Sequence, residues 1–576
     1  MEVYSISREI IVDSLSYKYD SSQETNLENI NLEVKKGEII GVLGVTGAGK
    51  TTLMRTLNGL IPQFFEGDIS GRVEVKGLDT QVYQIQSLIR KVGFVFDDPE
   101  TQIFGTNVRE DVAFGPANYG LPRQEIVKKI KDALYMVGLD GYEDRSTAKL
   151  SGGEKQRVAI AGVFAMGPDI LILDEPTAAL DPVGKSKIFE IIRELQAKGI
   201  TILLVEHETE EVARIADRII VLNEGQLVKE GSTREIFADI PFLREQKLRI
   251  PEMAGLGWQL FRQGLIDRAE IPLTVDEGEN LLRDRLRSDG EVSYNIKDEV
   301  LTPGLFPVIE VENLFFSYED DLDVLKNINL SINSGEFMAL VGQNGAGKTT
   351  FSKTLNKLLT PRQGTIKVNG YDTANMETAD LADTVGYVFQ NPDQQIFSST
   401  IKEEIEYGLK NMGVPEDERM SRIDKVLSAV ELDKPLDTNP FNLGKGERQR
   451  LAVASILALE PELLIIDEPT TGQDWQGTLN MMNLIKSLNK KGHTILIITH
   501  NMRIVADYCQ RVVVLSQGEI IADSSPRDIF ARPELLKKAK LRPPQISRLA
   551  LRLSDMGIPR EIININEMLS VLGQLI

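Results

Sequence analysis

Two glycine-rich stretches carry residue types that bind phosphate. They read GVTGAGKTT and GQNGAGKTT, and both fit the pattern G-x-x-x-x-G-K-[ST]. In such a loop backbone N–H groups close around phosphate oxygens, the lysine adds a point charge, and the threonine hydroxyl suits Mg²⁺. An apolar run before each stretch and a helical pattern after it favour this interpretation over a plain glycine-rich turn. The predicted contacts are Gly44, Thr46, Gly47, Ala48, Gly49, Lys50, Thr51 and Thr52, and then Gly342, Asn344, Gly345, Ala346, Gly347, Lys348, Thr349 and Thr350.

An Asp-Glu-Pro triplet follows an apolar, strand-like run in each half of the chain, in LILDEPT and LIIDEPT. Asp174 and Asp467 are predicted to hold Mg²⁺, together with the loop hydroxyls of Thr51 and Thr349. Glu175 and Glu468 are predicted to orient or deprotonate an attacking water. An isolated Asp-Glu pair is usually a solvated turn, but its place downstream of a phosphate-binding loop favours a metal ligand beside a base.

The chain has three histidines, and two of them end matching strand-like runs, at His207 and His500. A lone histidine is more often structural than catalytic. A matched pair in a chain so poor in histidine favours a catalytic role at both positions. The third, His493, has no counterpart and is predicted to lie at a strand edge.

These motifs belong to one long internal repeat. VGFVFDDPETQIF from Val92 returns as VGYVFQNPDQQIF from Val385, an offset of 293 residues. Nearer the start, Gly44 and Gly342 are 298 residues apart, and the longer PQFFEGDISG of the first copy against TPRQG of the second accounts for the difference. The repeat also covers the segments after the last motif, so each half is a domain with its own C-terminal appendage.

The repeat sets the predicted domain organisation. Residues 1–240 and 307–533 form two tandem domains, 241–286 and 534–576 are their appendages, and the polar, Gly- and Pro-containing stretch 287–306 is the linker. Each half begins with alternating, β-branched residues that favour an antiparallel layer, and continuous apolar runs later favour buried parallel strands. The sequence therefore predicts an α/β fold with two P-loop domains, each having a mainly parallel core sheet, an antiparallel layer and a helical subdomain.

Composition narrows the range of functions. Of the 576 residues, 86 are acidic and 65 basic, a formal charge of -21 that disfavours nucleic acid as a main partner. The single cysteine, Cys509, excludes a disulfide within the chain, fits a reducing cytoplasm and is predicted to be buried. There is no apolar run of the roughly 18 residues that a membrane span needs, and the first residues do not have a signal-peptide pattern.

LSGGE, lying between a phosphate-binding loop and a DEP triplet, resembles the signature of the ATP-binding-cassette ATPases, and both halves resemble such a domain. The resemblance implies ATP and Mg²⁺ as cofactors and two nucleotides held between paired halves. Each site would take its phosphate loop, DEP and histidine from one half and its signature from the other. It also implies that Tyr19 and Tyr318 stack on adenine, that Gln390 senses Mg²⁺ and the γ-phosphate, and that Asp181 and Asp474 approach the opposite site. The signature residues are Ser151, Gly152, Gly153 and Glu154, and in the second half Gly444, Lys445, Gly446 and Glu447.

The second signature, LGKGE, departs from the pattern because Gly444 and Lys445 replace serine and glycine. Losing a hydrogen bond to a charged group costs roughly 1.5–3 kcal/mol, or about ten- to hundredfold. Asp97 stands where the second half has Gln390, and a carboxylate there would repel phosphate. With crossed pairing, all these departures fall in the site that uses Lys50. We therefore predict that the Lys348 site hydrolyses ATP efficiently and the Lys50 site slowly. The alternative is sequence drift without kinetic consequence.

NGLIP, NPDQQIF, TTGQD and the repeated appendage are similar to the ATPases of energy-coupling-factor transporters, which import cobalt and vitamins. The resemblance implies a peripheral subunit on the cytoplasmic face of the cell membrane. Its partners would be a transmembrane coupling subunit and a substrate-capturing membrane subunit, and its two ATPase halves would pair within one chain. Asp98, Glu100 and Asp393 are candidates for receiving arginines of the coupling subunit, with solvated acidic loops as the alternative.

Two other classes of tandem ATPase fit the sequence less well than the importer does. A protein acting on ribosomes typically has a long, basic, helical linker, whereas the stretch 231–306 has more acids than bases. DNA-repair and chromosome ATPases need long coiled-coil insertions between the phosphate loop and the signature, for which the roughly hundred residues here leave no room. We therefore predict an importer. The sequence does not decide which vitamin or transition-metal ion it carries.

Overall fold

The computed structural model describes residues 8–22, 24–178, 180–286, 306–318 and 323–575. The chain divides into two compact units, Met1–Gly278 and Glu279–Ile576. The division falls inside helix α12 (Val275–Arg283), within the segment predicted as the first appendage. The predicted linker, apart from its last residue, lies outside the described residues, and the predicted domain boundaries stay predictions.

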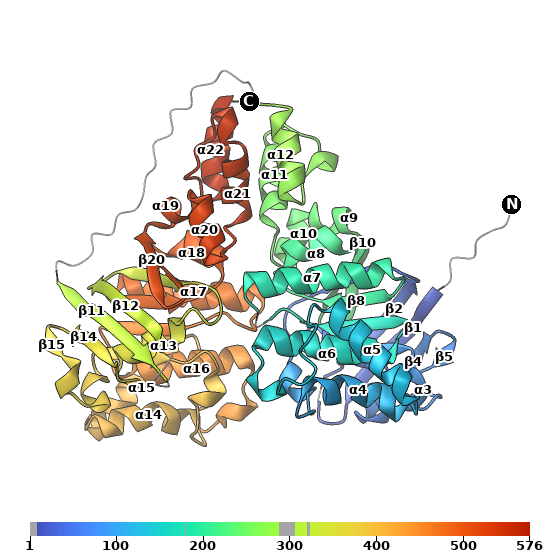
Figure 1. Cartoon of the computed structure of the whole chain (residues 1–576), viewed down its shortest axis with the longest axis horizontal. Coiled ribbons are helices and arrows are strands. Elements are labelled where there is room, and N and C mark those ends of the chain that lie inside the picture. Colours follow the sequence, from blue (N-terminus) through green and yellow to red (C-terminus); the bar gives the residue numbers. More distant parts are fainter. Residues whose placement is uncertain (1–7, 23, 179, 287–305, 319–322, 576) are drawn as a thin grey trace. The chain divides into compact units, whose positions relative to one another are not determined.

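The first unit contains two sheets (Figure 1). The antiparallel sheet has the order β2-β1-β4-β5, and the larger sheet has the order β10-β9-β3-β8-β7-β6, in which only β10 runs antiparallel to its neighbour. Their strands are β1 (Arg8–Tyr19), β2 (Leu27–Lys35), β3 (Ile39–Leu43), β4 (Gly67–Val75), β5 (Leu78–Asp79), β6 (Val92–Val95), β7 (Ile170–Asp174), β8 (Thr201–Val205), β9 (Arg218–Asn223) and β10 (Gln226–Ser232).

The second unit repeats this topology strand for strand. Its sheets have the orders β12-β11-β14-β15 and β16-β17-β18-β13-β19-β20. The strands are β11 (Pro307–Ser317), β12 (Asp323–Asn333), β13 (Phe337–Val341), β14 (Gln363–Val368), β15 (Tyr371–Asp372), β16 (Val385–Val388), β17 (Leu463–Asp467), β18 (Thr494–Ile498), β19 (Arg511–Ser516) and β20 (Glu519–Ser524). The predicted α/β class, with a mainly parallel core and an antiparallel layer in each half, is confirmed.

The central strands explain why the catalytic motifs follow apolar runs. Every residue of β3, β7 and β8 is buried, as is every residue of β13, β17 and β18. A parallel strand covered on both faces has no solvent side, so its sequence is continuously apolar instead of alternating. The loops that leave the carboxyl ends of these strands meet at one edge of the sheet, which brings distant motifs together.

Helices of the first unit cover the core sheet and build a helical layer, in which α4 and α5 pack on α6. They are α1 (Lys50–Leu57), α2 (Leu60–Gln63), α3 (Ile85–Leu88), α4 (Val108–Asn118), α5 (Arg123–Met136), α6 (Gly152–Met166), α7 (Pro182–Ala197), α8 (Thr209–Ile215), α9 (Thr233–Phe237), α10 (Ile240–Glu245) and α11 (Glu252–Arg262). Short 3₁₀ turns lie at η1 (Pro99–Thr101), η2 (Thr147–Lys149) and η3 (Arg268–Glu270). The predicted helical subdomain is therefore present.

The second unit has the corresponding helices, with α14 and α15 packed on α16. They are α13 (Lys348–Leu355), α14 (Ile401–Asn411), α15 (Glu416–Ala429), α16 (Lys445–Leu457), α17 (Trp475–Lys490), α18 (Met502–Tyr508), α19 (Pro526–Phe530), α20 (Pro533–Ala539), α21 (Gln545–Arg552) and α22 (Ile565–Leu575). Its 3₁₀ turns are η4 (Thr373–Asn375), η5 (Thr378–Leu381), η6 (Pro392–Gln394), η7 (Pro440–Asn442) and η8 (Ser554–Met556).

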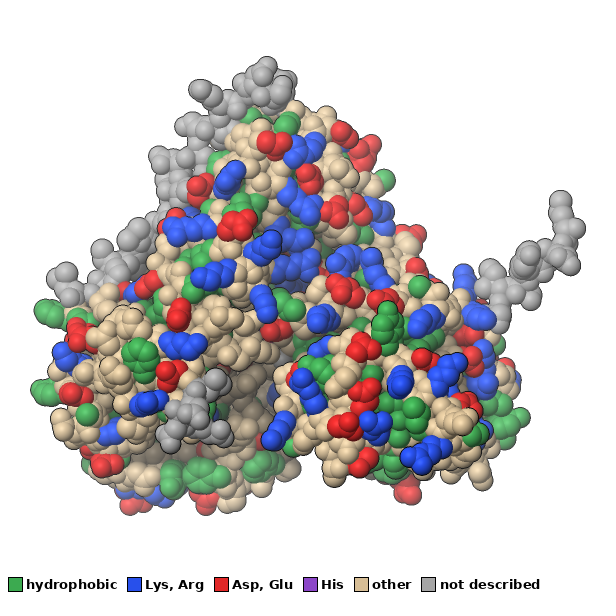
Figure 2. Space-filling view, viewed as in Figure 1, with side chains coloured by type: hydrophobic (Ala, Val, Ile, Leu, Met, Phe, Trp, Pro, Cys, Tyr) green, Lys and Arg blue, Asp and Glu red, His purple; other side chains and the backbone are tan. Residues whose placement is uncertain are grey.

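The surface charges, the lengths of the helices and the places of Cys509 and His493 can be compared with the sequence analysis. Lysine and arginine side chains are intermixed with acidic ones on the face shown in Figure 2. Within the described ranges, no helix is long and apolar enough to cross a membrane. Cys509 is buried, as predicted, and burial raises the pKa of its thiol. His493 immediately precedes β18, where its Nδ1 lies 2.9 Å from the carbonyl oxygen of Pro461.

Candidate nucleotide sites

The first residue of α1 or α13 is the lysine of a glycine-rich loop, and the residue before it has a left-handed backbone. Gly49 has a φ of 96° and Gly347 a φ of 101°, a region that residues with a Cβ rarely adopt. A Cβ on Gly49 would lie 2.8 Å from the carbonyl oxygen of Asn26. Only glycine fits at this turn, and the helix that follows presents its N-terminus, a position whose N–H groups favour an anion.

The two loop lysines are buried and turned back over their own loops. The Nζ of Lys50 donates to the carbonyl oxygens of Gly44, at 2.8 Å, and Val45, at 2.9 Å. In the second unit Lys348 makes the same pair of contacts, at 2.9 Å to the carbonyl of Gly342 and 3.0 Å to that of Gln343. Each loop therefore encloses an ammonium group at the position predicted for a phosphate.

The predicted metal ligands stand together in both units. The hydroxyl of Thr51 donates to Oδ2 of Asp174 at 2.8 Å, and that of Thr349 donates to Oδ2 of Asp467 at 2.9 Å. Hydroxyl and carboxylate oxygens suit Mg²⁺, which usually binds one or two protein groups and completes its shell with water and phosphate. In the parts of the chain that the structure covers, no three or more His, Cys, Asp or Glu side chains cluster as an all-protein metal cage. The donor set thus fits a magnesium ion that arrives with a nucleotide.

Both aspartates have a raised pKa. The pKa of Asp174 is raised to about 6, mainly by burial and also by the charges of Glu175 and Asp97, against the hydrogen bond from Thr51, which lowers it. Burial also raises the pKa of Asp467. A buried carboxylate with a raised pKa is stabilised by a cation placed next to it, so both sites are electrostatically prepared for one.

Tyr387 is a site residue that motif spacing did not reveal. Its hydroxyl donates to Oδ2 of Asp467 at 3.1 Å and lies 3.2 Å from the hydroxyl of Ser352. The first unit has Phe94 at the corresponding position, so Asp174 has no such partner from that strand. The difference between VGFVF and VGYVF is visible in the repeat, but its meaning depends on which face of β16 points at the aspartate.

The predicted bases and histidines also come together. His207 Nε2 lies 2.9 Å from Oε1 of Glu175, and His500 Nδ1 lies 2.9 Å from Oε1 of Glu468. Both glutamates have a left-handed backbone, with φ of 46° for Glu175 and 49° for Glu468. Such a conformation costs a side-chain-bearing residue of order 1–3 kcal/mol and is concentrated at functional sites. In each half of the chain, the predicted base is therefore in direct contact with the predicted catalytic histidine.

The two signature helices begin differently. The Ser151 backbone N–H donates to Oε2 of Glu154 at 2.8 Å, and the Ser151 hydroxyl accepts from the Glu154 N–H at 3.3 Å, a complete capping box. At the start of α16 only the backbone bond from Gly444 to Glu447 remains, at 3.0 Å, because glycine has no hydroxyl. The first signature offers a hydroxyl beside its N–H groups, and the second does not.

The Lys445 side chain is exposed, and its ammonium group lies close to a loop of its own unit. A Cβ on Gly472, in the loop after β17, would lie 2.3 Å from the Lys445 Nζ, so the ammonium group rests against that loop. The further acid of each signature is held from the helical layer, with Tyr142 donating to Glu154 at 2.9 Å and Lys434 pairing with Glu447 at 3.1 Å. The lysine of the degenerate signature thus lies beside the loop after β17 while its side chain stays exposed.

Other predicted contacts surround the loops. The Tyr19 hydroxyl lies 3.4 Å from that of Thr52, and the Tyr318 hydroxyl lies 3.2 Å from that of Thr350. Tyr318 is 64% exposed, which leaves its ring open to a base. Gln390 and Asp97 are exposed just beyond β16 and β6. Asp181 and Asp474, predicted to approach the opposite site, cap α7 and α17 by accepting from the N–H groups of residues 184 and 477.

The acids predicted to meet partner arginines are already bonded within their units. Glu100 pairs with Lys155 at 2.5 Å, and Asp393 pairs with Arg448 at 2.8 Å, so a repeated ion pair joins the turn after β6 or β16 to the signature helix. The Asp98 carboxylate accepts from the backbone N–H of Glu100. A partner arginine would have to compete with these contacts.

Exposed aromatic pairs lie beside those turns. The rings of Phe104 and Phe114 are 4.2 Å apart, and those of Phe397 and Tyr407 are 4.8 Å apart. All four side chains are at least half exposed, from 50% for Phe114 to 62% for Phe397. These four residues, which we call the aromatic pairs, occupy equivalent positions in the repeat.

Each unit thus holds a phosphate loop, a metal-ligand pair, a base with its histidine, and an aromatic ring, a combination that defines a P-loop ATPase domain. The family model for ABC transporters matches residues 27–178 and 325–471. The chain belongs to the ABC transporter family, and it is an ATP-binding subunit with two such domains in tandem.

Relatives agree over the full length of the chain. An ABC transporter ATP-binding protein of Caldanaerobacter subterraneus subsp. tengcongensis is 41% identical over 580 residues, covering 98% of each chain. A protein of the same description from Methanosarcina acetivorans is 41% identical over 564 residues, covering 96% of this chain and 91% of its own. Among solved structures, cbiO1 from Clostridium perfringens, part of the ABC transporter complex cbiONQ, is 38% identical over 43% of this chain and 98% of its own, with a TM-score of 0.38.

Proposed function

We propose that this chain is the ATP-hydrolysing motor of an energy-coupling-factor importer that takes up a vitamin or a transition-metal ion. The observation that carries the ATPase part is the paired geometry within each unit, where the Thr51–Asp174 and Glu175–His207 contacts recur as Thr349–Asp467 and Glu468–His500. The subtype rests on the motifs NGLIP, NPDQQIF and TTGQD and on the repeated appendage.

The residues divide the chemical work between them. Magnesium with ATP, when bound, supplies the phosphoryl group and neutralises charge that develops on it. The loop N–H groups and Lys50 or Lys348 hold phosphate oxygens, and the Thr–Asp pair holds the metal. Glu175 or Glu468 orients a water and receives its proton, and the histidine beside it keeps the carboxylate in place.

The two sites are proposed to be unequal. With the crossed pairing that the family resemblance implies, Lys348, Gln390 and Tyr387 would work with Ser151, whereas Lys50 and Asp97 would work with Gly444. Three observations support a more active Lys348 site: Ser151 has a hydroxyl that Gly444 lacks, Tyr387 donates to Asp467, and Asp97 adds negative charge near Asp174. Both sites keep their base and histidine, so both are proposed to bind ATP.

The aromatic pairs are proposed as the surface that docks on the transmembrane coupling subunit, which would place the chain at the cytoplasmic face of the membrane. Buried acids fix the segments that carry the aromatic pairs. Asp111 accepts from the backbone N–H of Phe104 at 3.0 Å, and Glu404 accepts from that of Phe397 at 3.1 Å. The rings therefore project from a rigid segment, and apolar anchors held in this way suit a helix-binding surface.

The experiment that tests this function combines fractionation with uptake. Phe104→Asp with Phe397→Asp is expected to release the chain from membranes and abolish uptake of the cargo, while ATP binding by the purified chain is retained. Tyr135→Asp with Tyr371→Asp is the matched control, because these tyrosines are 75% and 71% exposed on other surfaces. Co-sedimentation of the wild type with ribosomes instead of membranes would refute the importer.

A further inference from the structure

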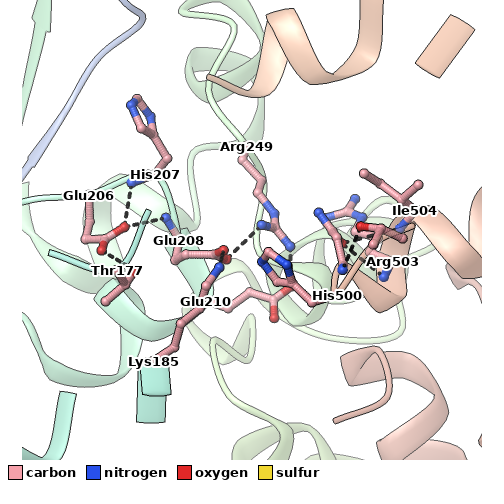
Figure 3. A network of polar contacts seen from close by, with 12 residues as sticks. Thr177, Lys185, Glu206, His207, Glu208, Glu210, Arg249, His500, Arg503 and Ile504 are labelled. Atoms are coloured by element: carbon pink, nitrogen blue, oxygen red, sulfur yellow. Dashed lines mark hydrogen bonds and ion pairs between the residues drawn. The ribbon is translucent and has the colours of Figure 1, made fainter. Parts of the chain in front are cut away.

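A buried carboxylate ties two catalytic loops of the first unit together. Glu206, at the end of β8, accepts hydrogen bonds from the hydroxyl of Thr177 and from the backbone N–H groups of His207, at 3.0 Å, and Glu208, at 3.2 Å (Figure 3). Thr177 stands two residues after the base Glu175. A carboxylate that is 3% exposed and receives three donors fixes the loop bearing the histidine against the loop bearing the base.

The same loop is held from a second side by the C-terminal appendage. The Arg249 guanidinium, from the segment between α10 and α11, donates through Nη1 to Oε2 of Glu208 at 2.9 Å, and its Nη2 lies 3.7 Å from Oε1 of Glu210 (Figure 3). Lys185 of α7 also donates to Glu208. Arginine presents several donors in a rigid fork, so it restrains the direction as well as the position of the carboxylate next to His207.

The second unit has different residues at four of these positions. The repeat places Thr499 at Glu206, Asn501 at Glu208, Arg503 at Glu210 and Thr478 at Lys185. Asn501 caps its own helix by accepting from the backbone N–H groups of residues 503 and 504, at 3.2 Å and 3.4 Å. The Thr499 hydroxyl accepts from the Asn501 N–H at 3.1 Å.

Arg542 is the repeat counterpart of Arg249. The second unit therefore has an arginine in its appendage but no carboxylate at the two loop positions where the first unit pairs with it. In the loop that bears His500, Thr499 and Asn501 accept from backbone N–H groups of the same loop and its helix, whereas the loop that bears His207 is also bonded to the appendage and to α7. This difference lies outside the phosphate, metal and signature motifs.

We propose that Arg249 is a positioning residue for His207, through which the first appendage sets the catalytic geometry of the Lys50 site and of that site only. Arg249 lies outside the phosphate, metal and signature motifs. It acts by holding Glu208, whose backbone N–H is bonded to the same Glu206 as that of His207. A displacement of the appendage would then change the contact between His207 and Glu175. In the second unit the positions of Glu208 and Glu210 are occupied by Asn501 and Arg503, which carry no carboxylate.

The test uses the full chain and the fact that it has three histidines. With ¹³C-labelled histidine, three ring signals are assigned from the His207→Gln, His493→Gln and His500→Gln variants. Arg249→Ala is expected to shift the His207 signal while the His493 and His500 signals stay in place. In Arg249→Lys, which keeps the charge, the His207 signal should lie closer to its wild-type position than in Arg249→Ala. Arg542→Ala is the matched control and should leave His207 unchanged.

A second variant and a kinetic readout guard against misfolding. Glu208→Gln removes the charge that Arg249 holds at nearly constant shape, and it should move the same signal. In a Glu468→Gln background, where turnover comes from the Lys50 site, Arg249→Ala should lower kcat about tenfold with little change in KM, as expected for a misplaced catalytic group. A His207 signal that stays fixed in both folded variants overturns the proposal.

The inference rests on the proposed function only where it assigns His207 to an ATPase site. Loss of uptake or membrane binding in the aromatic-pair variants tests the importer and leaves the histidine signals unaffected. A chain that fails as an importer but shows the selective His207 shift would keep the positioning role. A chain that imports but shows no shift would lose it.

Discussion

The imidazole of His500 lies 2.9 Å from the carboxylate of Glu468, and the residue that carries this carboxylate has a left-handed backbone with a φ of 49°. Strain at a residue other than glycine is maintained only when the surroundings determine it strongly. Here a strand end on one side and the histidine on the other hold the carboxylate in place. The first unit has the same relationship between His207 and Glu175, so the proposed difference between the sites rests on other residues.

Replacing the two bases separately measures that difference. Because a general base contributes about hundredfold or more, Glu468→Gln is expected to remove nearly all ATPase turnover of the complex, whereas Glu175→Gln should leave most of it. Single-turnover measurements with radiolabelled ATP on both variants check this. Equal loss in the two variants would mean equivalent or obligatorily coupled sites.

Repairing the second signature should accelerate the slow site. Gly444→Ser with Lys445→Gly adds the missing hydroxyl and removes the ammonium group that rests near Gly472. A hydrogen bond to a charged group is worth roughly 1.5–3 kcal/mol, so turnover in the Glu468→Gln background should rise about tenfold or more. The reverse change, Ser151→Gly, should slow the Lys348 site in a Glu175→Gln background. No gain from the repaired signature would favour sequence drift.

Asp174 should make the nucleotide-free protein less stable as pH rises. Its pKa is raised to about 6 in the folded state from an ordinary 3.8, so the folded state keeps the proton to higher pH than the unfolded state. The cost of ionising it begins near pH 4, grows as pH increases through the folded pKa, and reaches about 3 kcal/mol near neutral pH.

Asp174→Asn is therefore expected to raise the unfolding temperature of the first unit at neutral pH and to lose this advantage between pH 7 and pH 4. Differential scanning calorimetry without Mg²⁺ across this range is the measurement. Adding MgATP should reverse the ranking, because the cation is favoured by the carboxylate and not by the amide. An advantage for asparagine that is constant with pH would contradict the raised pKa.

The hydroxyl of Tyr387 should help the Lys348 site to hold Mg²⁺. Tyr387→Phe removes the donor to Asp467 without changing the ring, and the Mg²⁺ concentration for half-maximal turnover is expected to rise about three- to tenfold. The matched variant Phe94→Tyr places a hydroxyl at the corresponding position of the first unit. Magnesium titrations of both variants decide the point, and an unchanged midpoint in Tyr387→Phe would assign the hydroxyl to packing alone.

Much of the architecture was predictable because its signals are local or repeated. The core strands can be recognised in the sequence as continuous apolar runs, because both faces of the sheet are covered. The glycine-rich loops need Gly49 and Gly347 for their backbone geometry, so the pattern itself specifies the turn. The fold class predicted from these signals agrees with the structure.

The site was predictable only in part. Lys50, Asp174, Glu175 and His207 follow strand ends, and a parallel sheet brings such ends to one edge, so their meeting followed from the order of the motifs. The acids of the turns after β6 and β16 were candidates for a partner's arginines, with solvated loops as the alternative. The sequence did not show that Glu100 and Asp393 pair with the signature helix of their own unit. Charge and exposure along a sequence do not show which neighbour a side chain will find.

The sequence by itself determined the duplication, the two phosphate loops, the bases and histidines, and the defect in the second signature, since each depends on residue types at short spacing. Only the tertiary structure decided that Tyr387 reaches Asp467, 80 residues away, and that Arg249 reaches Glu208, 41 residues away. Contacts of this kind depend on which faces of packed elements meet. That choice is made by the whole core at once and leaves no periodic signal in the chain.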